Sequence, residues 1–220
     1  MTDPNTQPDA RERLLQAGIE IFAENGFNAT TTRMLADKAQ VNLSAIPYYF
    51  RSKEGLYHAT VGHIADVLAA HLAPFLERLQ TEAAKGFAPA TARLLLQEGL
   101  STMVSVMCGD PGTMRFSQII LREQMAPTAA FDLIYPKVME RILSAFTTLI
   151  ATITGEADAR QCSLQAILLV GQVMVFRAGR ATVVRRTGME GYTAREIAEI
   201  QALVVSRAMA ALDFMAARQA

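Results

Sequence analysis

Apolar residues recur at helical spacing along most of the chain. From Ala10 to Asn25 they follow the i, i+4, i+7, i+8 pattern of an amphipathic helix, and Gly26 is placed to end it. The hydroxyl-rich residues 29–32 are typical of a helix start, and they predict a short second helix that ends at Val41-Asn42. A third short helix is expected from about Leu43 to Phe50. The first 50 residues are therefore predicted to form three helices.

A fourth helix is predicted to start after Ser52, which caps it, and to run to about Ala73, where Pro74 should kink or stop it. Beyond Gly86 the apolar segments become longer, and glycine and proline turns separate them. These segments are expected at residues 89–107, 113–125, 128–153, 159–186 and 194–217. The pattern predicts an all-α protein of about nine helices, with a small three-helix N-terminal head and a larger C-terminal helical body.

Composition supports a helical protein but gives no charge-based clue to a partner. Half of the 220 residues are apolar, while 21 acidic and 21 basic residues cancel, so the chain lacks the basic excess of many nucleic-acid binders. Residues 1–9 are expected to be a flexible tail without a signal peptide. Residues 164–176 are apolar but too short to cross a bilayer. Cys108 and Cys162 are expected to be reduced thiols, so the chain is predicted to be cytoplasmic, without a membrane partner.

Residues 30–52 have the size and order of a helix-turn-helix, in which the second helix enters the major groove of DNA. That helix begins with small side chains that let its backbone approach the base edges, while Ile46 and Phe50 are expected to face inward. Hydroxyl groups and Lys53 are placed to bind phosphates, together with the N–H groups at the start of the fourth helix. The candidate DNA-binding residues are Thr30, Thr31, Thr32, Arg33, Asn42, Leu43, Ser44, Ala45, Pro47, Tyr48, Tyr49 and Lys53.

The segment Gly26–Tyr57 resembles the signature of the TetR family, through Gly26–Thr31, Leu35-Ala36, Ala39–Asn42 and Ile46–Tyr57. The resemblance implies a homodimeric regulator, in most cases a repressor, with a DNA-binding head at residues 10–57 and a ligand-binding and dimerisation body at residues 58–220.

Two positions depart from the family pattern. Gln40 stands where a glycine is usual, and Pro47 stands where a phosphate-binding tyrosine is common. The expected contacts therefore move towards Thr31, Ser44, Tyr48, Tyr49 and Lys53.

In the body, Pro127–Tyr135 and Gly171–Arg177 resemble the C-terminal domain of the CecR-like subgroup. This resemblance implies control of genes for efflux or detoxification, often genes for export by ABC transporters. We expect no cofactor, and an effector that is a small apolar or amphipathic molecule of unknown identity. Flexible methionines suit such a pocket, although packing in the core is the more ordinary role of any single methionine. The candidate pocket residues are Met103, Met107, Phe116, Phe131, Tyr135 and Phe176.

Dimerisation is expected through the last two long helices, which the family pairs into a four-helix interface. A helix such as 164–176 is apolar nearly all round and must be covered on more than one side. A partner subunit would cover it, and burial within one subunit is the alternative. The candidate interface residues are Ile167, Val170, Gly171, Met174, Val204, Val205, Met209 and Leu212. Such a dimer would place two recognition helices about 34–36 Å apart on a palindromic operator.

Two other function classes were weighed. An enzyme built in a helical bundle should show a paired Glu-x-x-His, His-Glu-x-x-His, Gly-x-Ser-x-Gly or phosphate-loop motif, and the sequence contains none, so we predict no catalytic residue. A non-DNA module that uses residues 42–50 as a protein contact is the second alternative. His58, His63 and His71 lie on the fourth helix, but their spacing matches no standard ligand pair, so no metal site is predicted.

Overall fold

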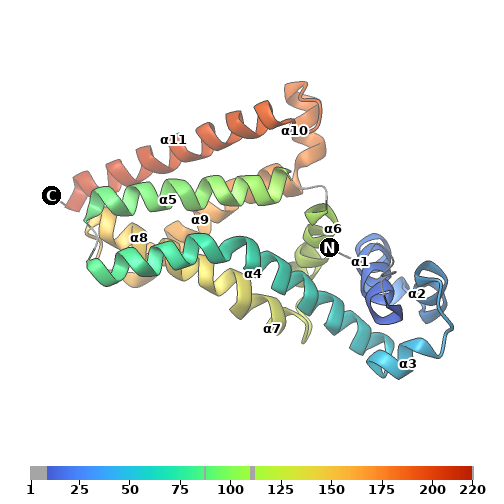
Figure 1. Ribbon diagram of the computed structural model, residues 1–220. Coiled ribbons are helices and arrows are strands. Elements are labelled where there is room, and N and C mark those ends of the chain that lie inside the picture. The colour runs from blue at the N-terminus through green and yellow to red at the C-terminus, as the bar shows by residue number, and fades with distance from the viewer. Residues whose placement is uncertain (1–8, 87, 110–111, 220) are drawn as a thin grey trace, which may run out of the picture. The chain divides into compact units, whose positions relative to one another are not determined.

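The computed structural model describes residues 9–86, 88–109 and 112–219, and this part of the chain is helical without strands (Figure 1). The predicted all-α class is confirmed. Residues 1–8 of the expected tail lie outside the described residues. The helices are α1 (Ala10–Ala29), α2 (Thr32–Ala39), α3 (Ala45–Phe50), α4 (Lys53–Lys85), α5 (Pro89–Val104), α6 (Thr113–Met125), α7 (Phe131–Ile134), α8 (Glu140–Thr154), α9 (Ala159–Ala178), α10 (Arg180–Thr187) and α11 (Ala194–Gln219), with π-helical segments η1 (Ser105–Gly109) and η2 (Tyr135–Met139).

Contacts divide the chain into two compact units. The N-terminal unit ends at Val67 and also takes in Arg115–Tyr135, whereas the C-terminal unit comprises Leu68–Met114 and the chain from Pro136 onward. The boundary expected after residue 57 thus falls inside α4, ten residues before the division of contacts. Most of α6 belongs with the head, which sequence patterns did not indicate.

In the N-terminal unit, α1 packs on α2 and α3, and a hydroxyl caps the start of α2 as the sequence predicts. The carboxylate of Asp9 accepts a hydrogen bond from the Glu12 N–H at 2.7 Å, and the Thr31 hydroxyl accepts one from the Met34 N–H at 3.2 Å. Gly26 interrupts α1 with a φ of 73°, after which one further turn continues to Ala29. The Thr31 cap and the glycine break are local features, which is why the sequence predicts them.

The turn between α2 and α3 places Gln40 in the left-handed region, with a φ of 53° and a ψ of 49°. Its N–H caps α2 by donating to the carbonyls of Ala36 and Asp37. The turn therefore keeps the conformation that glycine favours although a side chain occupies the position.

We expect Gln40→Gly to stabilise the protein by about 0.5–1 kcal/mol, because glycine adopts the left-handed conformation without the clash of a Cβ atom. Urea unfolding followed by circular dichroism measures the change. Gln40→Ala is the matched control and is expected to bring no gain, since alanine keeps the Cβ atom. Equal stability of the two variants would contradict a strained turn at this residue.

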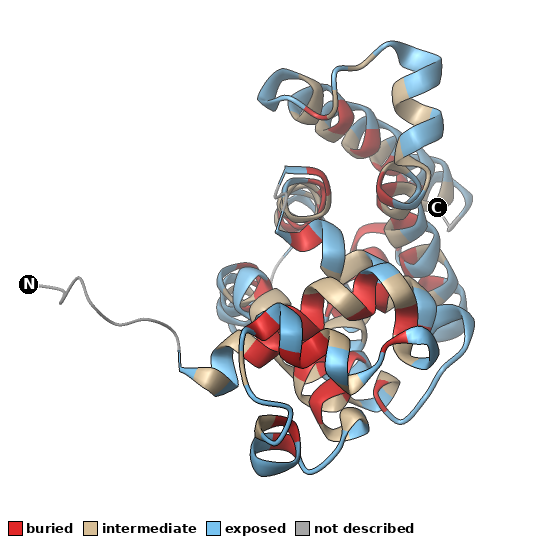
Figure 2. Ribbon diagram, turned by 90° about the vertical axis from the view of Figure 1, so that its right-hand side faces the viewer, coloured by how far each residue is buried: buried red, intermediate tan, exposed pale blue. Residues whose placement is uncertain are grey.

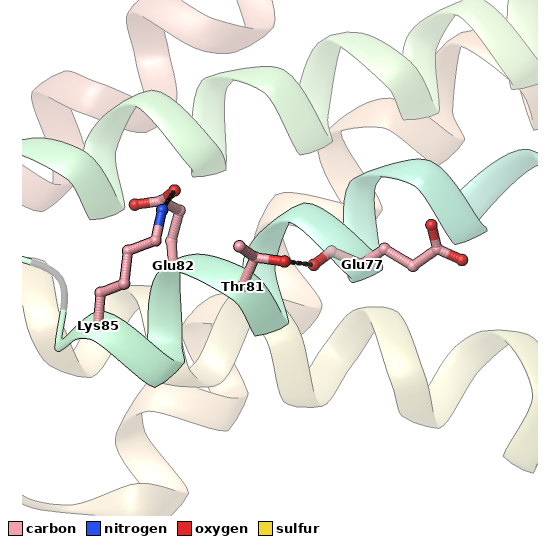
Figure 3. A network of polar contacts seen from close by, with 4 residues as sticks. All are labelled: Glu77, Thr81, Glu82 and Lys85. Carbon is pink, nitrogen blue, oxygen red and sulfur yellow. Dashed lines mark hydrogen bonds and ion pairs between the residues drawn. The ribbon is translucent and has the colours of Figure 1, made fainter.

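The prediction that α4 stops near Ala73 is wrong, because the helix passes through Pro74 and ends at Lys85. Phe75 and Leu76, which follow the proline directly, are buried in the core of the C-terminal unit, and this burial supports the helix where one N–H is missing. The exposed end carries polar contacts along the helix (Figure 3). Lys85 pairs with Glu82 at 2.8 Å, and the Thr81 hydroxyl donates to the Glu77 carbonyl at 2.9 Å.

The C-terminal unit is a helical bundle in which α5, α8, α9 and α11 pack against one another (Figure 1). Figure 2 marks the buried residues of the chain in red. Gly99 on α5 lets the rings of Phe75 and Phe146 approach, since a Cβ there would lie 2.8 Å from both rings. Cys108 and Cys162 are free and buried, and burial raises the pKa of the Cys108 thiol to about 11.

Three expected boundaries differ from the structure. The segment predicted at residues 159–186 breaks at Gly179 into α9 and α10. The segment predicted at 128–153 contains α7, η2 and α8, with Pro136 inside the π-helical turn. Residues 105–109 extend α5 as η1. A proline or a π turn shifts the backbone register without interrupting the apolar pattern, so periodicity alone does not detect these changes.

Candidate DNA-binding site and dimer face

The outward face of α3 and the turn before it carries Leu43, Ser44, Pro47 and Tyr48, all exposed, with Tyr48 at 80%. Residues Ile46 and Phe50 point into the core of the N-terminal unit, as predicted. The exposed and buried sides alternate at helical spacing, so this short helix presents one face away from the fold. Pro47 lies in the first turn, where its missing N–H removes no helical hydrogen bond.

The turn itself is held by Asn42, whose amide oxygen accepts hydrogen bonds from the N–H and from the hydroxyl of Ser44, both at 2.9 Å. The N–H of Ala45 donates to the Asn42 carbonyl at 2.9 Å and begins the helical path. This arrangement is an Asx turn, which fixes the direction in which α3 leaves α2.

One flank of α3 borders an open concavity of about 550 Å³ within the N-terminal unit. Its polar lining includes Ser44, Tyr48 and Tyr49 from the predicted set. Arg13 and Gln40 also line it, and sequence reasoning did not include them among the DNA-binding residues. The Nε group of Arg13 donates to the Ala39 carbonyl at 3.1 Å, which orients the guanidinium beside the turn. Arg13 is 26 residues from that carbonyl, so only the fold brings it to the site.

One predicted DNA contact, Thr30, is corrected, and a second, Lys53, makes contacts that the sequence does not show. Thr30 is only 1% exposed, and its hydroxyl donates to the Gly26 carbonyl at 2.7 Å, so it holds the chain that leaves α1. Lys53 donates through Nζ to the carbonyls of Phe27 and Thr30, both at 2.9 Å, and Nζ lies 4.2 Å from the centroid of the Phe27 ring. Lys53 therefore ties α4 to the α1–α2 connection. The sequence places a lysine near the DNA-binding segment but does not reveal these carbonyls.

The start of α2 offers the remaining predicted contacts. Thr31 and Arg33 are exposed, and Thr32 is half-buried. Thr31 already uses its hydroxyl oxygen as a cap acceptor and retains its O–H as a donor.

A buried polar cluster joins α6 to α4 inside the N-terminal unit. The Tyr57 hydroxyl donates to Oε1 of Glu123 at 2.6 Å, and Oε2 of Glu123 accepts from the Thr128 N–H at 3.0 Å. Glu123 is only 2% exposed. Burial, followed by the hydrogen bond to Glu123, raises the pKa of the Tyr57 hydroxyl, so tyrosine remains a donor at physiological pH.

Arginine side chains of α6 make a second set of contacts with α1. Arg122 donates to the carbonyls of Ala23 and Glu24 at 3.2 and 3.3 Å, where the carbonyl end of a helix attracts a cation. Arg115 lies 3.4 Å from Glu20, which in turn pairs with Lys38 of α2 at 2.6 Å. The hydrogen bond from Lys38, with a smaller contribution from Arg115, lowers the pKa of the Glu20 carboxyl. A chain of charges thus runs from α6 through α1 to α2.

The six predicted pocket residues belong to both units. In the C-terminal unit, Met103 is buried in the core, and Met107 and Phe176 pack partly buried against it. In the N-terminal unit, the rings of Phe131 and Tyr135 lie 5.7 Å apart, and Phe116 on α6 is half-buried.

The predicted dimer residues fall into three groups. Ile167 and Gly171 are exposed on α9, with Ile167 at 52%, whereas Val170, Met174, Val205 and Met209 are half-buried. Val204 and Leu212 are corrected, because they are 2% and 1% exposed and lie in the core that α11 shares with the subunit's own helices. The uncovered apolar residues that the prediction missed are Leu164, Leu168, Val175, Leu203 and Phe214.

These two helices are long and apolar yet poorly covered. In each, an 18-residue window has the hydropathy and length of a membrane-spanning helix, and only 22% of that window is buried; α4 also meets the length and hydropathy criteria. Gly171 is open, since a Cβ built there meets no atom within 4 Å. These exposed residues form a candidate dimer face, called the dimer face below: Leu164, Ile167, Leu168, Gly171 and Val175 of α9 with Leu203 and Phe214 of α11.

Among the described residues, no group of three or more His, Cys, Asp or Glu side chains is arranged to hold a metal ion.

Comparisons with known proteins agree with this geometry. Residues 14–60 match the family of bacterial regulatory proteins named tetR, and residues 92–215 match the C-terminal domain of the HTH-type transcriptional dual regulator CecR. The CecR of Shigella flexneri is 36% identical over 189 residues, which cover 83% of this chain and 82% of that protein. The transcriptional regulator RutR of Escherichia coli K12 is 30% identical over 115 residues, or 46% of this chain and 54% of RutR.

Solved structures share the fold. A TetR-like transcriptional regulator from Rhodococcus sp. RHA1 superposes with a TM-score of 0.63 at 20% identity, over 94% of this chain and 99% of that one. FadR from Bacillus subtilis, in complex with stearoyl-CoA, superposes with a TM-score of 0.53 at 19% identity, over 88% and 97%. The chain therefore belongs to the TetR family, carries a CecR-type C-terminal domain, and is a DNA-binding transcriptional regulator.

Proposed function

We propose that the protein is a homodimeric, ligand-responsive repressor in the cytoplasm that binds a palindromic operator through α3. Its operator contacts would divide between the two sides of α3. Ser44, Tyr48 and Tyr49, together with Arg13 and Gln40 around the concavity, would bind backbone phosphates, while the opposite flank of α3 faces base edges. Because residues 11–58 carry six basic against five acidic residues, shape and hydrogen bonds rather than net charge hold the DNA.

The dimer is supported by the dimer face of α9 and α11. Leaving these apolar side chains exposed to water is unfavourable, because each Å² of apolar surface in water costs about 25 cal/mol of free energy. A second copy of the chain would bury this face. It would also supply a second DNA-binding head, and two heads related by a two-fold axis match a palindromic operator. Gly171 lies within this face and allows close helix approach.

The observation that carries ligand response is the attachment of α6 to the head. Within the N-terminal unit, Glu123 and Arg122 hold α6 to α4 and α1. The first two residues of α6, Thr113 and Met114, belong to the C-terminal unit. A ligand that shifts α6 would therefore act on the head through these contacts, by an amount limited to its difference in affinity between the two states.

The effector is proposed to be apolar or amphipathic. Met107 and Tyr135 of the predicted pocket lie in η1 and η2, and π-helical turns are frequent at functional sites. The FadR structure contains stearoyl-CoA, an amphipathic ligand, in a protein of the same fold.

The CecR-like resemblance points to genes of efflux or detoxification as targets. RNA sequencing of a deletion strain tests this, and a change in both directions would fit a dual regulator such as CecR of Shigella flexneri.

Operator affinity with and without ligand tests the response. Fluorescence anisotropy on DNA from upstream of the gene would be measured with stearoyl-CoA and with anilinonaphthalene sulfonate, an amphipathic probe of apolar pockets. Binding of a probe should weaken operator affinity about 5- to 150-fold. The Arg122→Ala variant should bind the probe and show a smaller change. Saturating probe binding with unchanged operator affinity would contradict a response to ligands of this class.

We expect Tyr48→Ala to weaken DNA binding about tenfold, and to do so on operator and unrelated DNA alike, because phosphate contacts are independent of sequence. Tyr48→Phe separates the hydroxyl from the ring and should lose most of the same affinity. The salt dependence of binding should stay unchanged, since no charge is removed. A loss confined to the operator would instead assign Tyr48 to base recognition.

A further inference from the structure

The base-facing flank of α3 is apolar. Residues 43–50 contain no Arg, Lys, Asn, Gln, Asp or Glu, the charged and amide side chains that read bases through hydrogen bonds, and the Ser44 hydroxyl already donates to the Asn42 amide oxygen at 2.9 Å. Leu43 and Pro47 lie one helical turn apart, and both are exposed, with Leu43 at 47%. Neither lines the concavity on the other flank, where Ser44, Tyr48 and Tyr49 lie.

The polar residues next to this flank are not placed to replace such readers. A bidentate contact with adenine needs both the oxygen and the NH₂ group of an amide, and the Asn42 oxygen already accepts two hydrogen bonds from Ser44. Arg51 follows the C-terminal end of α3, at a φ of 68°, whereas the N-terminal residues of a recognition helix contact the base edges.

The major groove displays one apolar group, the C5 methyl of thymine. We propose that Leu43 and Pro47 recognise thymine methyl groups in each operator half-site, so that α3 selects its sequence by apolar contact rather than by paired hydrogen bonds. This inference rests on the proposed docking of α3 in the major groove. It adds a prediction for the operator, which must carry thymine where Leu43 and Pro47 meet the base edges.

Replacing thymine with deoxyuridine tests the inference directly, since uracil pairs identically and lacks only the methyl group. Footprinting on DNA from upstream of the gene first locates the half-sites. Each thymine there is then replaced in synthetic duplexes, and affinity is measured by fluorescence anisotropy. We expect about a fourfold loss of affinity for each contacted methyl group. Replacing the same contacted thymine in both half-sites should lower the affinity about 15-fold.

Leu43→Ala should bind more weakly and lose its sensitivity to uracil at one thymine of the half-site, while other thymines keep their effect. Leu94→Ala is the matched control, because Leu94 is an exposed leucine on α5 of the C-terminal unit. It should bind both duplexes like the wild type. Leu43 is exposed, so its replacement should leave the circular dichroism spectrum unchanged.

Three outcomes would overturn the inference. If the protein binds its site specifically and no uracil replacement weakens binding, the inference is wrong, while the proposed phosphate contacts of Tyr48 and Tyr49 are unaffected. A Leu43→Ala variant with full sensitivity at every thymine would remove Leu43 as a reader. Absence of any footprint would overturn the inference together with the proposed operator function, so the two failures are distinguishable.

Discussion

Gly171→Leu is expected to turn the proposed dimer into monomers that fold normally but no longer hold the operator. A Cβ atom added at Gly171 meets nothing within 4 Å in the subunit, and leucine is a better helix former than glycine. At the centre of the dimer face, two added leucines would force the α9 helices apart. Overpacking of this kind costs about 1–3 kcal/mol per site, so the dimer dissociation constant should rise about 100-fold or more.

Sedimentation equilibrium measures that constant, and thermal unfolding checks the fold. Operator affinity should fall when dimerisation is lost, since each subunit then binds its half-site alone. Gly62→Leu is a matched control, because Gly62 lies on α4 and also has no atom within 4 Å of an added Cβ. An unchanged dimer constant for Gly171→Leu would show that α9 does not meet its partner at this residue.

Glu123→Ala is expected to have the largest effect on the stability of the N-terminal unit. The change removes the acceptor of the Tyr57 hydroxyl and of the Thr128 N–H, and buried donors left without a partner are costly. We expect a loss of about 2–4 kcal/mol in the free energy of unfolding. The rate of amide hydrogen exchange should increase more in residues 120–130 than elsewhere in the chain, because these residues lose their hydrogen bond to α4.

Urea unfolding and hydrogen exchange by mass spectrometry measure both effects. Tyr57→Phe is the control, since it removes one hydrogen bond and leaves Thr128 bound to Glu123; it should cost about 1 kcal/mol. If Glu123→Ala were as stable as the wild type, the cluster would not be what holds α6 to the head.

Local features of this fold could be predicted, and contacts between distant residues could not. Thr31 and Gly155 act as caps within a few residues of their partners, so their sequence context is enough to identify them. The Tyr57–Glu123 hydrogen bond joins residues 66 positions apart, and no pattern in the sequence marks either as its partner. The assignment of α6 to the head depends on such contacts and was therefore missed.

The site shows the same division. The exposed face of α3 follows from helical periodicity, which places Ile46 and Phe50 inward and Tyr48 outward. A lysine beside a DNA-binding helix suggests a phosphate contact, and the sequence does not show that the Lys53 ammonium group also donates to two backbone carbonyls. The sequence shows the apolar stripe on α11 but not what it packs against. Val204 and Leu212 of this stripe lie in the subunit's own core.

The most direct test of the central proposal is equilibrium binding of the full-length protein to DNA from upstream of its gene. Fluorescence anisotropy at physiological salt would compare that duplex with a scrambled one, with titration to define the number of chains bound. We predict a preference of about a thousandfold or more and two chains for each palindromic site, both lost in Gly171→Leu. Equal affinity for the two duplexes would contradict operator recognition by α3.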